Sequence, residues 1–183
     1  MGSKSDDELV HLARAGSAEA MEELYVRHRG PLLRYLRRLM GDDSSAEDAF
    51  QEAFVYFFRH LERYEARGQL GAYLFRIARS IALDEKSAAR RERAAAERSA
   101  APESAAPPEE EEADPAAARA REALLELPAH LREVADLRLT ENLDYARIAE
   151  IQGVSEATAR SRMRYALEAL RAALGARKQE GAP

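Results

Sequence analysis

Histidine, the side chain most often used for acid–base or metal chemistry near neutral pH, occurs only singly along this sequence. The four histidines are His11, His28, His60 and His130, and none of them forms a His-Glu-x-x-His zinc motif. There is no cysteine, which excludes thiolate nucleophiles, disulfides and cysteine-ligated metals. The sequence also has no glycine-rich phosphate loop and no serine-centred nucleophile elbow. We therefore expect no catalytic residue, no metal, no cofactor and no enzymatic activity.

Arginine and hydroxyl side chains near the C-terminus suit a different task, hydrogen bonding to nucleic acid. In LDYARIAEIQGVSEATARSRMRYALEALRAAL, Asp144 and Ser155 can cap two helices, and Gly153 permits the turn between them. This spacing predicts a helix-turn-helix, a pattern also found in structural helix pairs and in protein-docking motifs. The outward residues of the second helix carry donors for base edges and phosphates. They are Thr158, Arg160, Ser161, Arg162, Arg164 and Tyr165.

A second basic pattern lies in the stretch GQLGAYLFRIARSIALDEKSAARR. Together with Leu83, basic residues from Arg76 to Arg93, just past this stretch, step by three and four along a predicted helix, which aligns them on one side and would suit a phosphate backbone. The alternative is a solvated helix face, since acidic residues are interspersed. The aligned basic residues are Arg76, Arg79, Lys86, Arg90 and Arg93.

Helices are expected to position these residues throughout the N-terminal part. A short helix is predicted over 6–15, and a longer one capped by Ser17 should run to Met40, with a break or kink at Gly30-Pro31 and a stop at Gly41.

A third helix is expected to begin at Ser45, which forms a capping-box-like pair with Asp48. Asp48, Gln51 and Glu52 fall on one face, which could receive basic side chains from a partner helix. The opposite face is an apolar stripe: Ala46, Ala49, Phe50, Ala53, Phe54, Phe57 and Leu61.

Charge and composition divide the chain. Residues 1–98 contain 17 basic and 17 acidic side chains, residues 99–122 contain 2 and 7, and residues 123–183 contain 9 and 9. The middle segment, rich in Ala, Pro and Glu, is too poor in apolar side chains to fold alone. We predict an all-α protein with two small helical domains, 1–98 and 123–183, joined by a flexible acidic linker. No segment resembles a membrane span or a signal peptide, so the expected location is the cytoplasm.

In this order, the motifs resemble those of the extracytoplasmic-function (ECF) class of the sigma-70 family. AEDAFQEAFVYFFRHLERY resembles the family's polymerase-binding helix. GQLGAYLFRIARSIALDEKSAARR resembles its −10 melting region. LPAHLREVADLRLTENLDYARIAEIQGVSEATARSRMRYALEAL resembles its −35-binding domain. The resemblance implies a bacterial sigma factor that binds core RNA polymerase and directs promoter recognition and transcription initiation. The alternatives are a sigma-like decoy and a helix-turn-helix regulator that does not engage polymerase.

The resemblance also assigns residues. Asp48, Gln51 and Glu52 would dock on the clamp of the largest polymerase subunit, and the C-terminal domain would contact the flap region of core RNA polymerase. The −10 contacts would be Tyr64, Arg67, Gly68, Gln69, Arg76, Arg79, Ser80 and Lys86. The −35 contacts would be Thr158, Arg160, Ser161, Arg162, Arg164 and Tyr165. An anti-sigma factor is a further implied partner.

Two departures and the linker add expectations. Tyr73 stands where the family usually has tryptophan, so we expect core packing with a polar tip. Ser80 replaces a common asparagine, which would alter the −10 preference. The acidic stretch APPEEEEADP would either occupy the polymerase's RNA path as a mimic of RNA or serve only as a solubilising tether.

Overall fold

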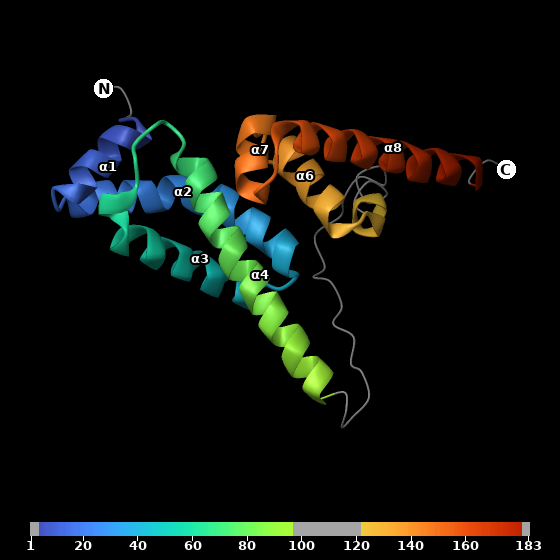
Figure 1. Cartoon of the computed structure of the whole chain (residues 1–183), viewed down its shortest axis with the longest axis horizontal. Helices are drawn as coiled ribbons and strands as arrows, with labels where there is room; N and C mark the ends of the chain where they lie inside the picture. The colour runs from blue at the N-terminus through green and yellow to red at the C-terminus, as the bar shows by residue number, and fades with distance from the viewer. Residues whose placement is uncertain (1–3, 97–121, 181–183) are drawn as a thin grey trace. The chain divides into compact units, whose positions relative to one another are not determined.

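The computed structural model describes residues 4–96 and 122–180, and both stretches are helical, with no β-strand in either (Figure 1). They belong to two separate folding units, which confirms the predicted all-α fold with two helical domains. The first unit contains α1 (Asp6–Arg14), α2 (Ala18–Met40), α3 (Asp43–Arg59), the 3-10 turn η1 (Leu61–Arg63) and α4 (Leu70–Ala96). The second contains α6 (Ala129–Leu139), α7 (Tyr145–Gln152) and α8 (Glu156–Glu180), preceded by a helical stretch over 122–126.

The core of the first unit is aromatic, and α2, α3 and α4 pack around it. The Tyr25 ring of α2 meets Phe50 and Phe54 of α3 edge-on, each with ring centroids 5.1 Å apart. Tyr35 of α2 and Phe75 of α4 make a similar contact at 5.1 Å. Edge-to-face pairs of this kind add to the stabilisation from area burial alone. The stiff aromatic core therefore fixes the outward faces of α3 and α4.

The start of α3 differs from the sequence prediction. Gly41 ends α2 in a left-handed conformation, with φ of 91°, and Asp42 follows in extended backbone. The Asp42 carboxylate then accepts a hydrogen bond of 2.7 Å from the N–H of Ser45, so Asp42 is the N-cap. The predicted cap at Ser45, paired with Asp48, is wrong, because an earlier polar residue already has the extended conformation that a cap requires.

The break or kink expected at Gly30-Pro31 does not interrupt the helix. Residues 18–40 form one helix with Pro31 inside it. Pro31 has no N–H to donate to the carbonyl of Arg27, so α2 runs through this point at a local cost. Packing of α2 against α1, α3 and α4 holds the helix together despite that cost.

The second unit is a helix-turn-helix built on α6. Asp144 caps α7 by accepting a 2.9 Å hydrogen bond from the N–H of Arg147, and Ser155 accepts one of 3.1 Å from the N–H of Thr158 at the start of α8. Gly153 between the helices has φ of 66°, where a side chain would be strained. The caps and turn predicted from the sequence are therefore confirmed.

Among the helices of the described residues, none has the length and apolar character that crossing a membrane would need.

Candidate functional site

The first candidate surface lies on α3. Asp48, Gln51 and Glu52 are exposed, on the side of the helix away from the buried rings of Phe50 and Phe54. Residues three and four apart share one face of a helix, so the three polar side chains are neighbours. The structure therefore brings together the residues that the sequence had grouped.

Two exposed apolar side chains extend this surface by one turn. Val55 and Tyr56 are 48% and 45% exposed, and they follow Gln51 and Glu52 by four residues. The Tyr56 ring stacks on His60, with centroids 4.2 Å apart. The sequence analysis did not single out either residue, although their spacing of four from Gln51 and Glu52 predicts that they lie on the same face of the helix. We call this surface the α3 face: Asp48, Gln51, Glu52, Val55 and Tyr56.

The helix α4 adds a carboxylate beside the α3 face. Burial raises the pKa of Glu85, and the negative charges of Glu52, Asp48 and Asp42 raise it further. The acidic character therefore continues from α3 onto α4. The periodicity of α3 alone carries no signal for Glu85, because its position depends on how α4 packs against α3.

The second candidate surface is the segment that contains η1 and leads into α4, which we call the loop 61–69. Tyr64 is buried, and its ring centroid lies 6.1 Å from that of Phe57 and 5.0 Å from that of Tyr73. Its hydroxyl is buried, and burial together with the charge of Asp7 raises its pKa, although the backbone N–H groups of Gln69 and Arg67 oppose this shift. Tyr64 therefore anchors the loop, and its ring does not lie on the surface.

The other predicted residues of the loop 61–69 are exposed. Arg67, Gly68 and Gln69 are accessible, and the Arg67 guanidinium forms an ion pair with the carboxylate of Glu65. Gly68 has φ of 67°, which turns the chain sharply before α4 begins. The exposed backbone and side chains of this tight turn can reach a ligand that approaches from solvent.

The N-terminal helix contacts this loop, which the sequence did not predict. The Asp7 carboxylate of α1 accepts hydrogen bonds of 2.9 and 3.2 Å from the N–H of Gly68. The Arg14 guanidinium donates to the carbonyl of Leu61 at 3.0 and 3.1 Å, and also to the carbonyl of Tyr64. These partners are 47 to 61 residues apart in the sequence, so no local pattern reveals them.

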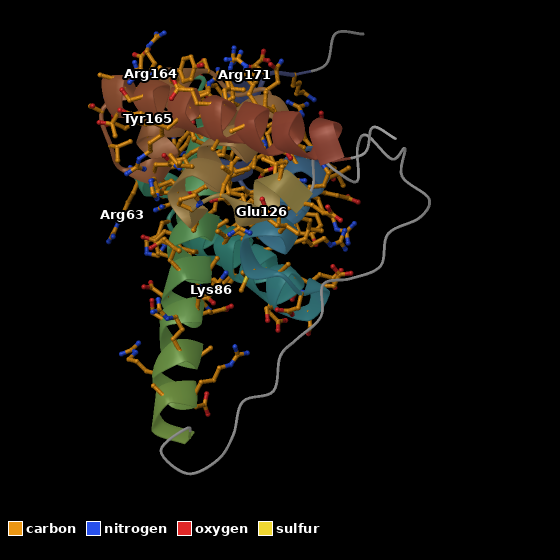
Figure 2. All side chains as sticks on the ribbon, turned by 90° about the vertical axis from the view of Figure 1, so that its right-hand side faces the viewer. Arg63, Lys86, Glu126, Arg164, Tyr165 and Arg171 are labelled. Carbon is orange, nitrogen blue, oxygen red and sulfur yellow. The ribbon has the colours of Figure 1, made fainter. Side chains whose placement is uncertain are left out.

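The predicted basic stripe on α4 is less uniform than its spacing implied. Arg76 is exposed, with its guanidinium carbon 5.2 Å from the ring centroid of Tyr73. Arg79 is half-buried, and Ser80 is exposed. The Lys86 ammonium, labelled in Figure 2, donates a 2.7 Å hydrogen bond to the carbonyl of Leu39. Lys86 thus ties α4 to the end of α2.

Tyr73 packs as expected, between core and surface. It is half-buried, and its ring contacts Phe57 and Tyr64. Burial raises the pKa of its hydroxyl.

The third candidate surface is the first half of α8. Arg160, Ser161, Arg164 and Tyr165 are exposed, and Figure 2 labels the last two on the outer surface of the helix. Thr158 is half-buried next to its cap. These exposed groups offer several hydrogen-bond donors within two turns of one helix.

Arg160 is held by a ring from the preceding helix. Its guanidinium carbon lies 4.9 Å from the ring centroid of Tyr145, and its side chain forms an ion pair with Glu156. The guanidinium of Arg138 lies 5.2 Å from the same ring and also donates a 2.9 Å hydrogen bond to the carbonyl of Leu143. Sequence analysis missed Tyr145, whose role depends on the crossing of α7 and α8.

Arg162, in contrast, contacts the interior. Its guanidinium donates a 2.9 Å hydrogen bond to the side-chain carbonyl of Gln152, whose amide donates a 3.0 Å bond to the carboxylate of Glu133. Both Gln152 and Glu133 are buried. This chain of polar groups joins α6, α7 and α8 and fixes their crossing.

Comparisons with known proteins agree with this architecture. The family model described as Sigma-70 region 2 matches residues 24–92, and the one described as Sigma-70, region 4 matches residues 123–172. The ECF RNA polymerase sigma factor SigL of Mycobacterium tuberculosis is 34% identical over 165 residues, covering 88% of this chain and 93% of SigL. The RNA polymerase sigma factor CarQ of Myxococcus xanthus is 33% identical over 163 residues, with the same coverage of 88% and 93%.

A solved structure shares the fold. It is the sigma factor RpoE of Bartonella quintana in complex with the anti-sigma factor NepR, with a TM-score of 0.67, 23% identity, and coverage of 84% of this chain and 96% of that one.

Regions 2 and 4, one on each helical unit, define a sigma factor, which is a non-enzymatic transcription initiation factor. The chain belongs to the ECF class of the sigma-70 family: it is an RNA polymerase sigma factor that directs transcription initiation.

Proposed function

We propose that the α3 face is the surface through which this sigma factor binds core RNA polymerase. The observation that supports this assignment is a cluster of exposed carboxylates backed by a rigid aromatic core, with Val55 and Tyr56 exposed beside it. An acidic rim with apolar residues suits a basic, partly apolar partner helix such as those of the polymerase clamp. Asp48, Gln51 and Glu52 supply the polar contacts.

The loop 61–69 and α4 are proposed to bind the −10 element. A pocket that prefers an unstacked base opens the duplex without any bond chemistry, because binding energy offsets the cost of unpairing. Arg67, Gly68 and Gln69 are exposed at the tight turn and would meet the flipped base, with Tyr64 supporting them from below. The residues that would hold strand phosphates or neighbouring bases are Arg76, Arg79, Ser80 and Lys86.

The exposed half of α8 is proposed to bind the −35 element in the major groove. Arg160 and Ser161 are the principal base contacts, with Thr158, Arg164 and Tyr165 at their flanks. The guanidinium of Arg162 is bonded to Gln152, so we assign Arg162 a supporting contact with DNA and not a principal one. The same domain would contact the polymerase flap.

We place the functional domains at 1–98 and 123–183, with the acidic segment 99–122 between them. An anti-sigma factor is a further proposed partner, on the precedent of RpoE bound to NepR.

The test of the α3 face is co-elution of the chain with bacterial core RNA polymerase in size-exclusion chromatography. Glu52→Arg is the test variant, and Glu22→Arg is its control, because Glu22 is an exposed glutamate on α2 outside the α3 face. We expect the wild type and Glu22→Arg to co-elute with polymerase and Glu52→Arg to elute alone. Co-elution of folded Glu52→Arg at the wild-type level would reject the α3 face as the docking surface.

A further inference from the structure

The helix α1 lies outside the residues matched by the region 2 family model, which begin at 24, and yet it contacts the loop 61–69. We propose that α1 is a positioning element for promoter opening: Asp7 and Arg14 hold the loop 61–69 in the shape that receives the unstacked −10 base. This inference rests on the proposed −10 function of the loop and adds two residues to it.

The contact at Gly68 fixes the turn where the loop would meet DNA. Both oxygens of the Asp7 carboxylate lie within hydrogen-bond distance of the Gly68 N–H, at 2.9 and 3.2 Å. Glycine populates φ values of both signs almost equally, so Gly68 alone would not hold its φ of 67°. A hydrogen bond to a charged acceptor is stronger than a neutral one, and here it selects one conformation of the neighbours Arg67 and Gln69.

The contact at Arg14 fixes the other end of the same segment. One guanidinium bonds the carbonyls of Leu61 and Tyr64, which lie at the start of η1 and directly after it. The planar donor group of arginine can hold two acceptors in a fixed geometry. Asp7 and Arg14 therefore brace the loop 61–69 at both of its ends.

The helix α1 is itself attached firmly enough to serve as a support. Leu9, Val10 and Ala13 are buried against the rest of the unit. Asp6 bonds Arg27 at 2.8 Å and His28 at 3.0 Å, both on α2. A loop held in its binding shape before the ligand arrives loses less conformational entropy on binding, and this is how α1 would strengthen base capture.

The first measurement examines the brace without DNA. Arg67 is exposed, so trypsin cleavage after Arg67, followed by mass spectrometry, reports how often the loop opens. We expect Asp7→Ala to raise the rate of this cut about tenfold, because a factor of this size corresponds to the loss of roughly one charged hydrogen bond. Asp7→Asn keeps a hydrogen-bond acceptor, so its rate of cleavage should lie between those of the wild type and Asp7→Ala. Glu8→Gln removes a carboxylate in the same turn of α1 whose hydrogen bonds, within the part of the chain that the structure describes, go to Ser5, and this variant should match the wild type.

The second measurement examines −10 binding. A promoter is selected with wild-type holoenzyme from a duplex library randomised over both elements, and the selected non-template −10 strand is used as a labelled oligonucleotide. We expect holoenzyme carrying Asp7→Ala or Arg14→Lys to bind this strand about 5–10-fold more weakly, with co-elution with core polymerase unchanged. An oligonucleotide abasic at the captured position should bind wild type and Asp7→Ala equally.

Variants of the loop 61–69 distinguish a failure of the positioning role of α1 from a failure of the proposed −10 role of the loop. Arg67→Ala and Gln69→Ala should weaken −10 binding directly. If they do so while Asp7→Ala and Arg14→Lys bind like the wild type, the positioning role of α1 is overturned and the −10 role of the loop stands. If Arg67→Ala and Gln69→Ala also bind like the wild type, the proposed function of the loop fails. An unchanged rate of cutting after Arg67 in folded Asp7→Ala would overturn the brace itself.

Discussion

His28 is a half-buried histidine whose ring nitrogen Nε2 lies 3.0 Å from the carboxylate of Asp6. Burial lowers the pKa of His28 below its ordinary value of 6.5, the nearby Arg27 lowers it too, and the charge of Asp6 opposes the shift without cancelling it. The imidazole is therefore neutral in the folded protein at pH 7. The unfolded chain binds a proton on His28 more readily than the folded chain does.

The consequence is an acid-sensitive contribution to stability. A histidine with a lowered folded pKa stabilises the fold above its unfolded pKa, and this contribution is lost as pH falls below about 6.5. We expect His28→Gln to flatten the dependence of the free energy of unfolding on pH between about 7 and 5, by at most about 1.4 kcal/mol per pH unit. Urea unfolding at several pH values measures this slope. An equal slope in wild type and His28→Gln would contradict the assignment.

Tyr145 gives a second prediction at the residue scale. Its ring lies between the guanidinium groups of Arg138 and Arg160, at 5.2 and 4.9 Å, so we expect it to orient Arg160 for the −35 element. Tyr145→Leu should weaken −35 duplex binding about 3–10-fold, whereas Tyr145→Phe keeps the ring and should bind like the wild type. Fluorescence anisotropy with a selected promoter duplex measures both. Equal binding by Tyr145→Leu would remove Tyr145 from the positioning of Arg160.

Individual side chains were predictable where one helix decides their exposure. The periodicity of α3 placed Glu52 outward and Phe54 inward, as the structure has them. Local patterns elsewhere in the chain did not reveal that Tyr64 is buried or that the guanidinium of Arg162 bonds Gln152. Those outcomes depend on which helix packs across the residue. The bond from Gly68 to Asp7 joins positions 61 residues apart, so it follows from the tertiary fold and not from any local pattern.

At the scale of elements, helix ends were predictable and helix continuity was less so. Gly41 and Gly153 stop α2 and α7, as their freedom to adopt positive φ predicts. The start of α3 was misplaced because Asp42 and Ser45 are both good caps, and local sequence does not decide between them. Gly30-Pro31 indicated a break or kink in α2, and tertiary packing carries the helix through this point without a break.

Alanine substitutions at Pro31, inside α2, and at Gly41, at its end, should change the free energy of unfolding in opposite directions. Pro31→Ala restores an N–H inside the helix, so we expect it to raise the free energy of unfolding by about 1–3 kcal/mol. Gly41→Ala puts a side chain at φ of 91°, and should lower it by about 1–2 kcal/mol. Urea unfolding followed by circular dichroism measures both. A Pro31→Ala protein less stable than the wild type would show that proline is required for the path of α2.

At the scale of the whole molecule, composition separated two helical units from an acidic segment. The family resemblance then assigned a function to each unit. The charge of −5 for the chain as a whole equals the excess of acid in residues 99–122 alone, since the two flanking segments are each neutral. Segment charge therefore says more about partners than total charge does. The acidic stretch itself falls within residues 97–121, outside the described residues, so its docking stays a prediction.

That prediction is tested by changing charge without changing length. If the glutamates 109–112 enter a basic channel of the polymerase, replacing all four with glutamine should weaken holoenzyme affinity about tenfold at low salt. Replacing the same four with aspartate keeps the charge and should preserve affinity. The difference between the two variants should shrink in about 0.5 M salt, where the Debye length falls to roughly 4 Å. Equal affinity of the glutamine and aspartate variants at low salt would leave the segment as a tether, because a strand that acts only by its length is indifferent to its charge.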